Sequence, residues 1–439
     1  MKKIFKNFAI IFFIILIFSS CTDNKKNNED VELIFWHSFV SSTIPALNQL
    51  IMKFETENPG IKIKAQYIPT GDAHIQKLIT AIQSNNAPDI SWLHSDYLED
   101  LVEADAIYKI DDFISTDSTF DPSEIEHIYP SLIPLASWRG TLYSLPMEAT
   151  NLALLYNKTM FREAGLDPEL PPSTWDELYS YSKKLTIDKD GDGKYDQVGF
   201  FLPIFPAAGP QSGWMVWQFY PYLWQAGGFI IDENQKNVLY NQEAGIKALT
   251  LWKKIYEELD LRNFTTDFDV TFASERLAMA MDGPWNLPRY KDLLKNIDWG
   301  FAPLPAGPKK KATVVGGEYL AIFKQSKHPT ESWEFLKWII KPENQAFWAM
   351  QSGYLPIRDD AIEVPEFQKY LKDNSNFKVF VEQMSVGQAN RPIDYNALQV
   401  VNHIAQAIEK ATVGRMDVKK SLNDSALKSN QVIKRNDNK

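Results

Sequence analysis

Polar and aromatic side chains gather where three predicted strands end. The strands cover residues 31–36, 61–68 and 88–93. The residues at and just after their ends are Trp36, His37 and Ser38, then Thr70, Gly71 and Asp72, then His94, Ser95 and Asp96. Carboxylates and hydroxyls pair with the hydroxyls of a polar solute, and rings pack on its C–H faces, so these residues indicate recognition of a small polyol. A lone histidine is also often structural, and Asp96 could equally cap a helix starting at Tyr97.

Aromatic rings are concentrated in one short segment. Residues 214–224 contain six rings and are flanked by glycines and a proline. Each ring buries a large area, and one amphipathic helix does not need so many of them. We therefore expect some of these rings to line a cleft, with Trp214 and Trp217 as candidates, while the others fill the core.

An acidic loop resembles a calcium-binding loop. Asp188, Asp190, Asp192 and Asp196 occupy positions one, three, five and nine, and glycine occupies position six. Position twelve should carry a bidentate acid but is Gly199. A structural calcium ion is therefore one interpretation, and a tight acidic turn without metal is the other. No other cofactor is expected.

No motif in the chain requires catalysis. The HExxH, GxSxG and Gly-rich phosphate-loop patterns are absent from the sequence. The chain has a single cysteine, which excludes a disulfide framework and a cysteine-based metal site. Carboxylate pairs suited to glycoside hydrolysis are easy to find among 56 acidic residues, so their presence does not favour a glycosidase.

Alternating strands and helices position the strand-end residues. Apolar residues at helical spacing predict helices over 44–57 and 74–85, between the three strands. This order implies a parallel sheet with right-handed crossovers, and ligands of such sheets bind outside the carboxyl ends of the strands. Later in the chain we expect helices over 157–165, 242–259 and 330–340, a helix opening at 171–177, and strands over 299–303 and 313–323.

The N-terminus has the features of a secretion signal. Three lysines precede an apolar run from Phe8 to Phe18, which is too short for a stable membrane span. Ser19-Ser20-Cys21 follows and resembles the lipobox of bacterial lipoproteins, in which the cysteine is lipidated and becomes the new N-terminus. We expect residues 1–20 to be a signal peptide and 21–30 a lipidated tether that holds the protein in the cell envelope. An ordinary signal with a chance cysteine is the alternative.

Chain length and net charge restrict the possible partners and the number of lobes. The chain has 439 residues and a formal net charge of −10, and removing three signal lysines brings the mature chain near −13. Such an acidic body lacks the clustered Lys and Arg that a nucleic-acid partner needs. Roughly 420 residues exceed what one hydrophobic core organises, so two lobes are expected.

Short motifs along the mature chain resemble one known family. They are Phe35-Trp36-His37-Ser38, Asn58-Pro59, Asn86-Ala87-Pro88-Asp89-Ile90, Leu155-Tyr156-Asn157-Lys158, Ala164-Gly165-Leu166, Pro172-Ser173-Thr174-Trp175-Asp176-Glu177-Leu178, Ala278-Met279-Ala280-Met281-Asp282-Gly283-Pro284-Trp285, Gly316-Gly317 and Ser352-Gly353-Tyr354-Leu355-Pro356. Their order and spacing are similar to those of the extracellular solute-binding proteins of bacterial ABC importers. Within that family, the chain resembles the carbohydrate-binding branch that includes maltodextrin-binding and glycerol-3-phosphate-binding proteins.

The resemblance implies an α/β fold with two lobes joined by hinge crossovers, the periplasmic-binding-protein fold. It assigns residues 31–146 and 298–347 to lobe I, and residues 147–297 and 348–430 to lobe II. Members of the family hold the solute between the lobes, close around it, and dock on a membrane permease, and we expect this chain to do so as a monomer. Closure follows when a ligand binds the shut form better than the open one.

The resemblance also selects site residues. Trp285 matches the ring that stacks on sugar in maltodextrin-binding relatives, although a buried wedge in the hinge is its alternative role. Ser95 and Asp96 match polar sugar contacts, and Glu148 and Thr150 lie at the predicted crossover.

The remaining candidates are Gly317, Glu318, Tyr319 and Arg391, and they come from the residues themselves. Glu318 and Tyr319 follow Gly316-Gly317, where small residues permit close backbone approach. Arg391 could reach the cleft from the C-terminal part of the chain, and a surface ion pair is its alternative role.

Three functions remain open at this point. The favoured one is a non-catalytic receptor for a sugar or oligosaccharide. The second is a receptor for glycerol-3-phosphate or a glycerophosphodiester, which needs cations or convergent N–H groups. Sugar is preferred because the candidate residues are mainly acidic and aromatic, with Arg391 as the one cation. A secreted glycosidase is the third.

Overall fold

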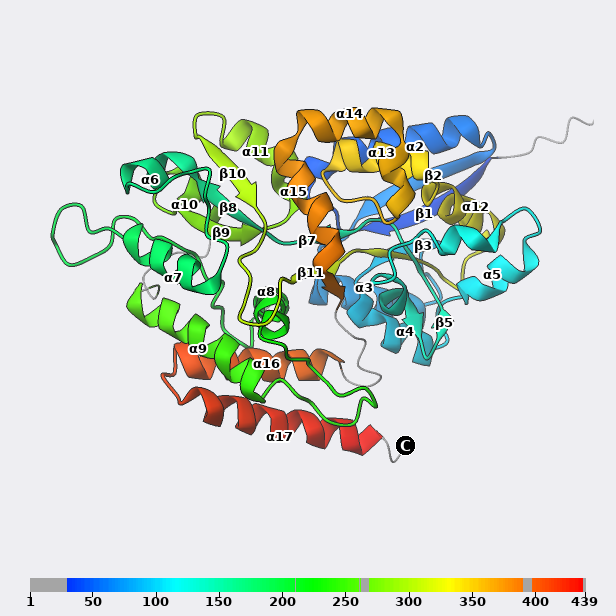
Figure 1. The fold of residues 1–439 in the computed structure, drawn as a ribbon. Coiled ribbons are helices and arrows are strands. Elements are labelled where there is room, and N and C mark those ends of the chain that lie inside the picture. The colour runs from blue at the N-terminus through cyan, green and yellow to red at the C-terminus, as the bar shows by residue number, and fades with distance from the viewer. Residues whose placement is uncertain (1–29, 210, 260, 262–267, 390–396, 437–439) are drawn as a thin grey trace, which may run out of the picture.

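A parallel sheet forms the first part of the fold. The computed structural model describes residues 30–209, 211–259, 261, 268–389 and 397–436 (Figure 1). Strand β1 (Val31–His37) pairs in parallel with β2 (Ile61–Tyr67) on one side and with β3 (Ile90–Leu93) on the other. The connections are helices α2 (Ile44–Glu57) and α3 (Asp72–Gln83), so the predicted strand–helix alternation is confirmed.

Two later strands complete this sheet. Strand β12 (Tyr319–Ile322) pairs antiparallel with β3, and β6 (Leu145–Pro146) pairs with β12. The full order is β2-β1-β3-β12-β6. A strand from late in the chain therefore lies beside the N-terminal strands, because the chain leaves this lobe after β6 and returns at β12.

The second part of the fold has two small sheets. In one, β8 (Ala153–Asn157) lies between β9 (Met279–Asp282) and β10 (Trp299–Ala302), and all pairs are antiparallel. In the other, β11 (Thr313–Gly316) lies between β7 (Thr150–Asn151) and β13 (Gly387–Ala389). Strands β4 (Ser137–Trp138) and β5 (Thr141–Leu142) form a separate two-stranded ribbon beside the first sheet.

The strand pairing and the course of α13 bear on two of the predicted lobe boundaries, those at residues 298 and 347. Residues 298–347 were expected in lobe I, but β10 and β11 pair with strands β8 and β7 of the second part. We therefore propose that the return to lobe I lies at Gly316–Gly317. The expected boundary at residue 347 falls inside helix α13 (Pro342–Ser352), which is continuous. The proposed first crossover stays at residues 147–149, between β6 and β7.

Helices cover both parts (Figure 1). Those near the first sheet include α12 (Pro329–Ile339), which packs on β1 and β12, and α13, which packs on α2. In the second part α8 (Ser212–Gln225), α9 (Glu243–Glu258), α16 (Ala397–Thr412) and α17 (Val418–Asn436) pack together. The others are α4 (Leu98–Glu103), α5 (Ile110–Thr116), α6 (Lys158–Glu163), α7 (Trp175–Lys184), α10 (Phe268–Ala273), α11 (Leu287–Leu293), α14 (Pro365–Asp373) and α15 (Ser375–Gln383).

Side-chain caps explain where two helices begin. The Thr174 hydroxyl accepts the backbone N–H of Glu177 at 3.2 Å, and the Glu177 carboxylate accepts the N–H of Ser173 at 2.7 Å. Thr174 rather than Ser173 is therefore the cap of α7, and Glu177 reaches back to the residue before the cap, in an arrangement close to a capping box. Asn157 caps α6 by accepting the N–H of Met160 at 3.0 Å. The helix openings expected near 157 and 173 are confirmed.

Helix α8 explains most of the aromatic segment. Phe219, Tyr220, Tyr222 and Trp224 are buried, and only Trp214 and Trp217 keep part of their surface exposed. Pro221 lies inside the helix, where proline removes one backbone hydrogen bond. Packing of the surrounding buried rings stabilises the helix in spite of this loss. Four of the six rings are therefore core residues, and two remain available for a site.

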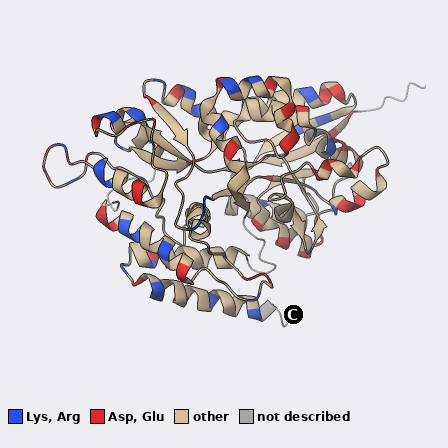
Figure 2. Cartoon of the chain, viewed as in Figure 1, with Lys and Arg blue, Asp and Glu red and all other residues tan. Residues whose placement is uncertain are grey.

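Surface charge and hydropathy agree with the sequence analysis. Acidic and basic side chains are interspersed on outer helices such as α9 and α14 (Figure 2). Among the described residues, no helix combines the length and the apolar character that a membrane span requires.

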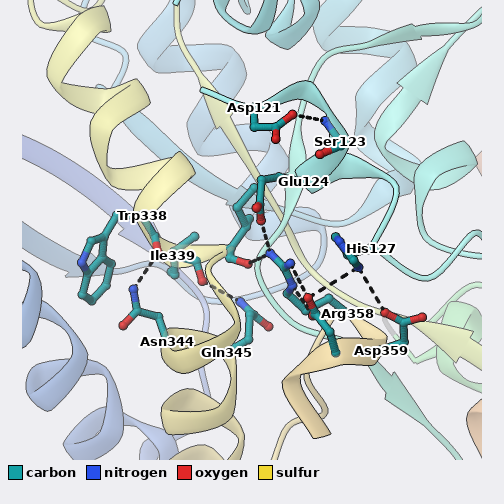
Figure 3. A network of polar contacts seen from close by, with 12 residues as sticks. Asp121, Ser123, Glu124, His127, Trp338, Ile339, Asn344, Gln345, Arg358 and Asp359 are labelled. Atoms are coloured by element: carbon teal, nitrogen blue, oxygen red, sulfur yellow. Dashed lines mark hydrogen bonds and ion pairs between the residues drawn. The ribbon is translucent and has the colours of Figure 1, made fainter. Parts of the chain in front are cut away.

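A buried arginine ties the chain after α13 to the first lobe (Figure 3). Arg358 is 1% exposed and donates to Glu124 at 2.7 Å, to the carbonyl of Ile340 at 2.8 Å and bidentately to Asp360 at 2.5 and 2.7 Å. Gln345 of α13 donates to the carbonyl of Met147 at 3.0 Å. These bonds hold the segment after α13 and the first crossover in fixed positions relative to each other.

Candidate functional site

Four rings from three segments form an aromatic cluster. Trp214 and Trp217 of α8 stack at 5.4 Å between ring centroids. Trp285, in the short 3₁₀ helix Pro284–Asn286 after β9, lies 5.8 Å from Trp214 and 6.2 Å from Trp217. The fourth ring is Tyr354, at 6.4 Å from Trp285. We call these four residues the aromatic cluster.

Tyr354 was not predicted as a site residue, although its motif was recognised. Gly353 ends α13 in the left-handed conformation at φ 84°, and a Cβ there would lie 2.6 Å from the carbonyl oxygen of Pro284. Glycine thus lets the chain after α13 pass directly against the segment that carries Trp285. Tyr354 also stacks on Trp348 at 6.4 Å, so it links the cluster to α13.

Two carboxyl groups lie beside the rings, at the crossovers. Glu148 is fully buried, and its Oε2 accepts the indole N–H of Trp348 at 2.8 Å. The Glu318 carbonyl accepts the N–H of Met147 at 2.8 Å, which joins the two crossover segments. A Cβ at Gly317 would lie 2.1 Å from the backbone oxygen of Glu148, so only glycine allows this approach. The two glutamates are therefore held side by side.

Both carboxyl groups have raised pKa values. Burial raises the pKa of Glu318 to about 7. Burial raises the pKa of Glu148 well above its usual value, and the neighbouring Glu318 charge raises it further. The Trp348 indole N–H opposes this shift without cancelling it. Both carboxyl groups are therefore harder to ionise than an exposed glutamate.

The rings and the carboxyl pair belong to one site. A Cβ at Gly316 would lie 3.3 Å from the ring of Trp217, and Gly316 pairs with Thr150 in the β11–β7 ladder. The hydroxyls of Thr150 and Tyr319, and one oxygen each of Glu148 and Glu318, are buried without a hydrogen-bond partner in the structure. Buried polar groups are normally paired, so these four orphaned atoms are the ones a bound solute would satisfy.

The end of β3 contributes to the same region. His94 Nδ1 lies 4.0 Å from Glu318, and its Nε2 is 3.1 Å from the Thr70 hydroxyl. Asp96 is half-buried, and burial raises the pKa of its carboxyl. Helix α4 begins at Leu98 with no side-chain cap, so the capping alternative for Asp96 is not observed. Ser95 begins the 3₁₀ turn before α4 and is half-buried.

The end of β1 is packed inside the first lobe instead of facing the site. Trp36 is 6% exposed, donates to Gln66 at 3.1 Å, and packs in a hydrophobic cluster with Ile68 and Ile75. We therefore exclude Trp36 from the proposed site. The strand alternates its side chains, so the ring lies on the opposite face from Phe35, in a second buried cluster.

His37 and Ser38 are also core residues. The His37 ring stacks on Phe39 at 5.5 Å, and burial lowers its pKa to about 4. The Ser38 hydroxyl lies 2.9 Å from Nδ1 of the buried His74, whose Nε2 is 3.1 Å from the Ser91 hydroxyl. Both residues thus take the structural role that was the alternative interpretation.

Four predictions concern residues that lie, wholly or with their side chains, outside the described part of the chain: Asp72, Arg391, Cys21 and the signal peptide. Asp72 begins α3, but its side chain is not among those described. Arg391 lies outside the described residues, and so do Cys21 and the expected signal peptide. These assignments stay predictions.

The acidic loop brings three of its four carboxylates together. Oxygens of Asp188, Asp190 and Asp196 lie within 4.8 Å of one another, and Asp192 is not part of this group. Backbone N–H groups of Gly193 and Gly191 donate to Asp188 at 2.9 and 2.8 Å, and they lower its pKa. The calcium assignment stays a prediction, and so does the tight-turn alternative.

Calcium binding is testable directly. Titration of calcium into metal-stripped protein is expected to release heat with a stoichiometry of one, and Asp188→Asn together with Asp190→Asn should abolish that heat. Substitution of Asp176, a surface acid at the start of α7, by Asn is the control and should leave the heat unchanged. Absence of heat with the unaltered protein would favour the turn without metal.

The fold and the site together define a two-lobe solute-binding protein. The model of the bacterial extracellular solute-binding protein family matches residues 49–374, and the chain belongs to this family. The match spans both crossovers and the aromatic cluster.

Curated relatives and solved structures agree with this assignment. The sn-glycerol-3-phosphate-binding periplasmic protein of Escherichia coli (strain K12) is 26% identical over 416 residues, which cover 91% of this chain and 92% of that protein. The cyclic alpha-maltosyl-1,6-maltose binding protein from Arthrobacter globiformis has a TM-score of 0.78 and 26% identity, and the match covers 92% of this chain and 99% of that one.

A further structure supports the fold. An ABC transporter solute-binding protein from Thermotoga lettingae, bound with alpha-D-tagatose, has a TM-score of 0.78 at 22% identity, with 92% of this chain and all of that one covered. The predicted α/β two-lobe fold and the predicted family are confirmed.

Proposed function

We propose that this chain is a non-catalytic receptor that captures a sugar or oligosaccharide between its lobes and delivers it to an ABC importer. The observation that carries the proposal is the aromatic cluster beside four orphaned buried polar atoms, on Glu148, Thr150, Glu318 and Tyr319. Rings that pack on C–H faces and oxygens that accept hydroxyl hydrogens are complementary to a sugar.

The main alternative is a phosphorylated glycerol solute, because relatives at 26% identity bind sn-glycerol-3-phosphate. A phosphate needs cations or convergent N–H donors. Among the described residues, no hydrogen bond or ion pair brings a Lys or Arg to either glutamate, and the imidazole of His94 is 4.0 Å from Glu318. The environment that the described part of the chain provides therefore favours an uncharged solute.

The proposal includes the cellular setting. Cys21 would carry the lipid that anchors the mature chain by its tether, on the outer face of a membrane where an importer's permease subunits lie. We further propose that the receptor works as a monomer, since the family's closure mechanism needs only the two lobes of one chain.

A thermal-shift panel of sugars and phosphorylated solutes tests the proposal. A solute present at a hundredfold excess over its dissociation constant should stabilise the protein by about 2.7 kcal/mol. A strong preference for glycerol-3-phosphate would favour the alternative. Hydrolysis of any glycan by the pure protein would contradict the non-catalytic assignment.

Removing the central ring should weaken solute binding. Trp285→Ala is expected to lower the affinity for the sugar found in the panel by ten- to a hundredfold, about 1.4–2.7 kcal/mol, because the ring contacts three others in the cluster. Calorimetry measures the change. Tyr195→Ala, which removes a ring that is 41% exposed in the acidic loop, is the control and should leave affinity unchanged. Unchanged affinity in Trp285→Ala would place the solute elsewhere.

A further inference from the structure

The four oxygens of the two crossover glutamates have unequal surroundings. Glu148 Oε2 accepts the Trp348 indole N–H at 2.8 Å. One oxygen of Glu318 lies 4.0 Å from His94 Nδ1, beyond hydrogen-bonding distance. Among the described residues, Glu148 Oε1 and Glu318 Oε2 are buried and have no hydrogen-bond partner, although the Trp92 indole is near enough to lower the pKa of Glu148. Each carboxyl therefore has one oxygen that no described side chain meets in a well-formed hydrogen bond.

The two carboxyl groups are within hydrogen-bonding reach of each other. Two ionised carboxylates in contact repel, and two acceptors cannot form a hydrogen bond without a proton between them. Their backbones are pinned by the Met147–Glu318 bond at 2.8 Å and by the close approach at Gly317, so the side chains cannot simply separate. A single proton between them resolves both the repulsion and the missing donor.

Within the described part of the chain, the other groups around the pair do not supply a positive charge. His94 approaches from the end of β3, and burial lowers its pKa to about 4, so it is neutral at pH 7. Tyr319 of β12 and Tyr354 after α13 have pKa values raised well above 10 by burial, with a further rise from the nearby carboxylates, so both hydroxyls stay protonated. Trp348 and Trp92 face the pair with neutral indoles.

We propose that Glu148 and Glu318 share one proton and act as a single acid–carboxylate unit that makes the site select uncharged, hydroxyl-bearing solutes over phosphate esters. This rests on the proposed function, since it assigns the solute's charge at the same site. With one proton the unit keeps one negative charge in a buried region, which repels a phosphate. Its acid and carboxylate oxygens meet hydroxyls, which both donate and accept.

The proton itself can be observed without any solute. In protein labelled with ¹³C at glutamate carboxyls, two resonances should titrate far above the usual pH range, and one of them should show its midpoint near pH 7. Glu148→Gln should remove one of these resonances and shift the midpoint of the other, which stays above the range of an ordinary glutamate because burial is the main cause of its raised pKa. The amide of Gln supplies the missing donor, so this variant is expected to fold. If both glutamates titrate near pH 4.5 in the unaltered protein, the shared proton is excluded.

The stability of the solute-free protein gives a second readout. A raised carboxyl pKa stabilises the folded state fully below the unfolded pKa of ~4.3, and this contribution is lost as pH rises through the folded pKa. The unfolding equilibrium constant should therefore increase with pH between about 5 and 7, by up to about tenfold per unit for one proton. In Glu148→Gln this increase should be smaller, and an unchanged profile would contradict the proposal.

Solute selection is tested separately. The thermal-shift panel is repeated at pH 7.5 with the double variant Glu148→Gln and Glu318→Gln, which removes both carboxyl groups, using the same sugars and sn-glycerol-3-phosphate. Loss of the charge should narrow the preference for uncharged over phosphorylated solutes by about threefold or more. An unchanged preference would refute the selection role even if the titration shows the shared proton. If no solute of any kind binds while the titration succeeds, the proposed function fails and the proton pair stands.

Discussion

Replacing Arg358 by Met is expected to lower the free energy of unfolding by about 3 kcal/mol, because it leaves hydrogen-bond acceptors unpaired around a buried position. Arg358 is 1% exposed and serves Glu124, Asp360 and the carbonyl of Ile340 (Figure 3). Arg358→Lys should also destabilise, since an ammonium cannot reproduce the bidentate contact with Asp360. Urea unfolding at pH 7 measures both changes.

The pH dependence separates this network from a packing effect. Burial alone would raise the pKa of Asp360, but the hydrogen bonds and charge of Arg358 outweigh it, so the pKa is lowered. A lowered carboxyl pKa contributes stability above the unfolded pKa of ~3.9 and loses it as pH falls. The difference between Arg358→Met and the unaltered protein should thus shrink below about pH 4. A constant difference would indicate packing only.

An exposed ion pair provides the matched control. Lys64 and Glu32 are 3.3 Å apart, and both side chains are 56% exposed. Lys64→Met removes a long cationic side chain, as Arg358→Met does, but from the surface of strand β2. Surface pairs contribute little, so this change should stay within about 0.5 kcal/mol.

Gly317→Ala is expected to lower the free energy of unfolding by about 3 kcal/mol and to weaken solute binding at least about tenfold. The added Cβ would lie 2.1 Å from the backbone oxygen of Glu148, so the two crossover segments must move apart. This movement would separate Glu148 from Glu318 and break the bond from Met147 to the Glu318 carbonyl. Urea unfolding and calorimetry measure the two effects.

A glycine beside the aromatic cluster serves as control. Gly213 precedes Trp214 in α8, and a Cβ there meets no atom within 4 Å. Gly213→Ala should therefore change the free energy of unfolding by less than about 1 kcal/mol. Any change should be a gain, because alanine favours helix more than glycine does. If Gly317→Ala were equally mild, the crossovers would be more deformable than their contacts indicate.

Local sequence patterns were sufficient for many helices and strands. Helix α2 begins and ends where its apolar spacing and the following Asn58-Pro59-Gly60 predict, because both signals are local. Lobe membership depends instead on strand pairing between distant segments. Nothing in residues 299–302 shows that they pair with β8 rather than returning to the first sheet. The boundary that we propose at Gly316–Gly317 therefore could not be found from the local pattern.

The site was predicted in part. Family resemblance selected Trp285 and the two glutamates, which the structure brings together, but it could not show that they are close enough to share a proton. The burial of Trp36 could not be predicted because the strand has apolar residues on both faces, and its pattern does not tell which buried face holds a ring. Tyr354 was missed because its contacts come from a turn after α13, which carries no local signal of function.

The late position of β12 has a consequence for biogenesis. More than 200 residues separate it from β3, the strand it pairs with. While the ribosome is still synthesising that intervening stretch, the first three strands have an open edge where β12 will later add. A nascent chain in this state cannot complete the folding of its first sheet. Its unpaired strand edge is then able to pair with other chains. We expect cotranslational protection by chaperones to matter most until about residue 322 has emerged.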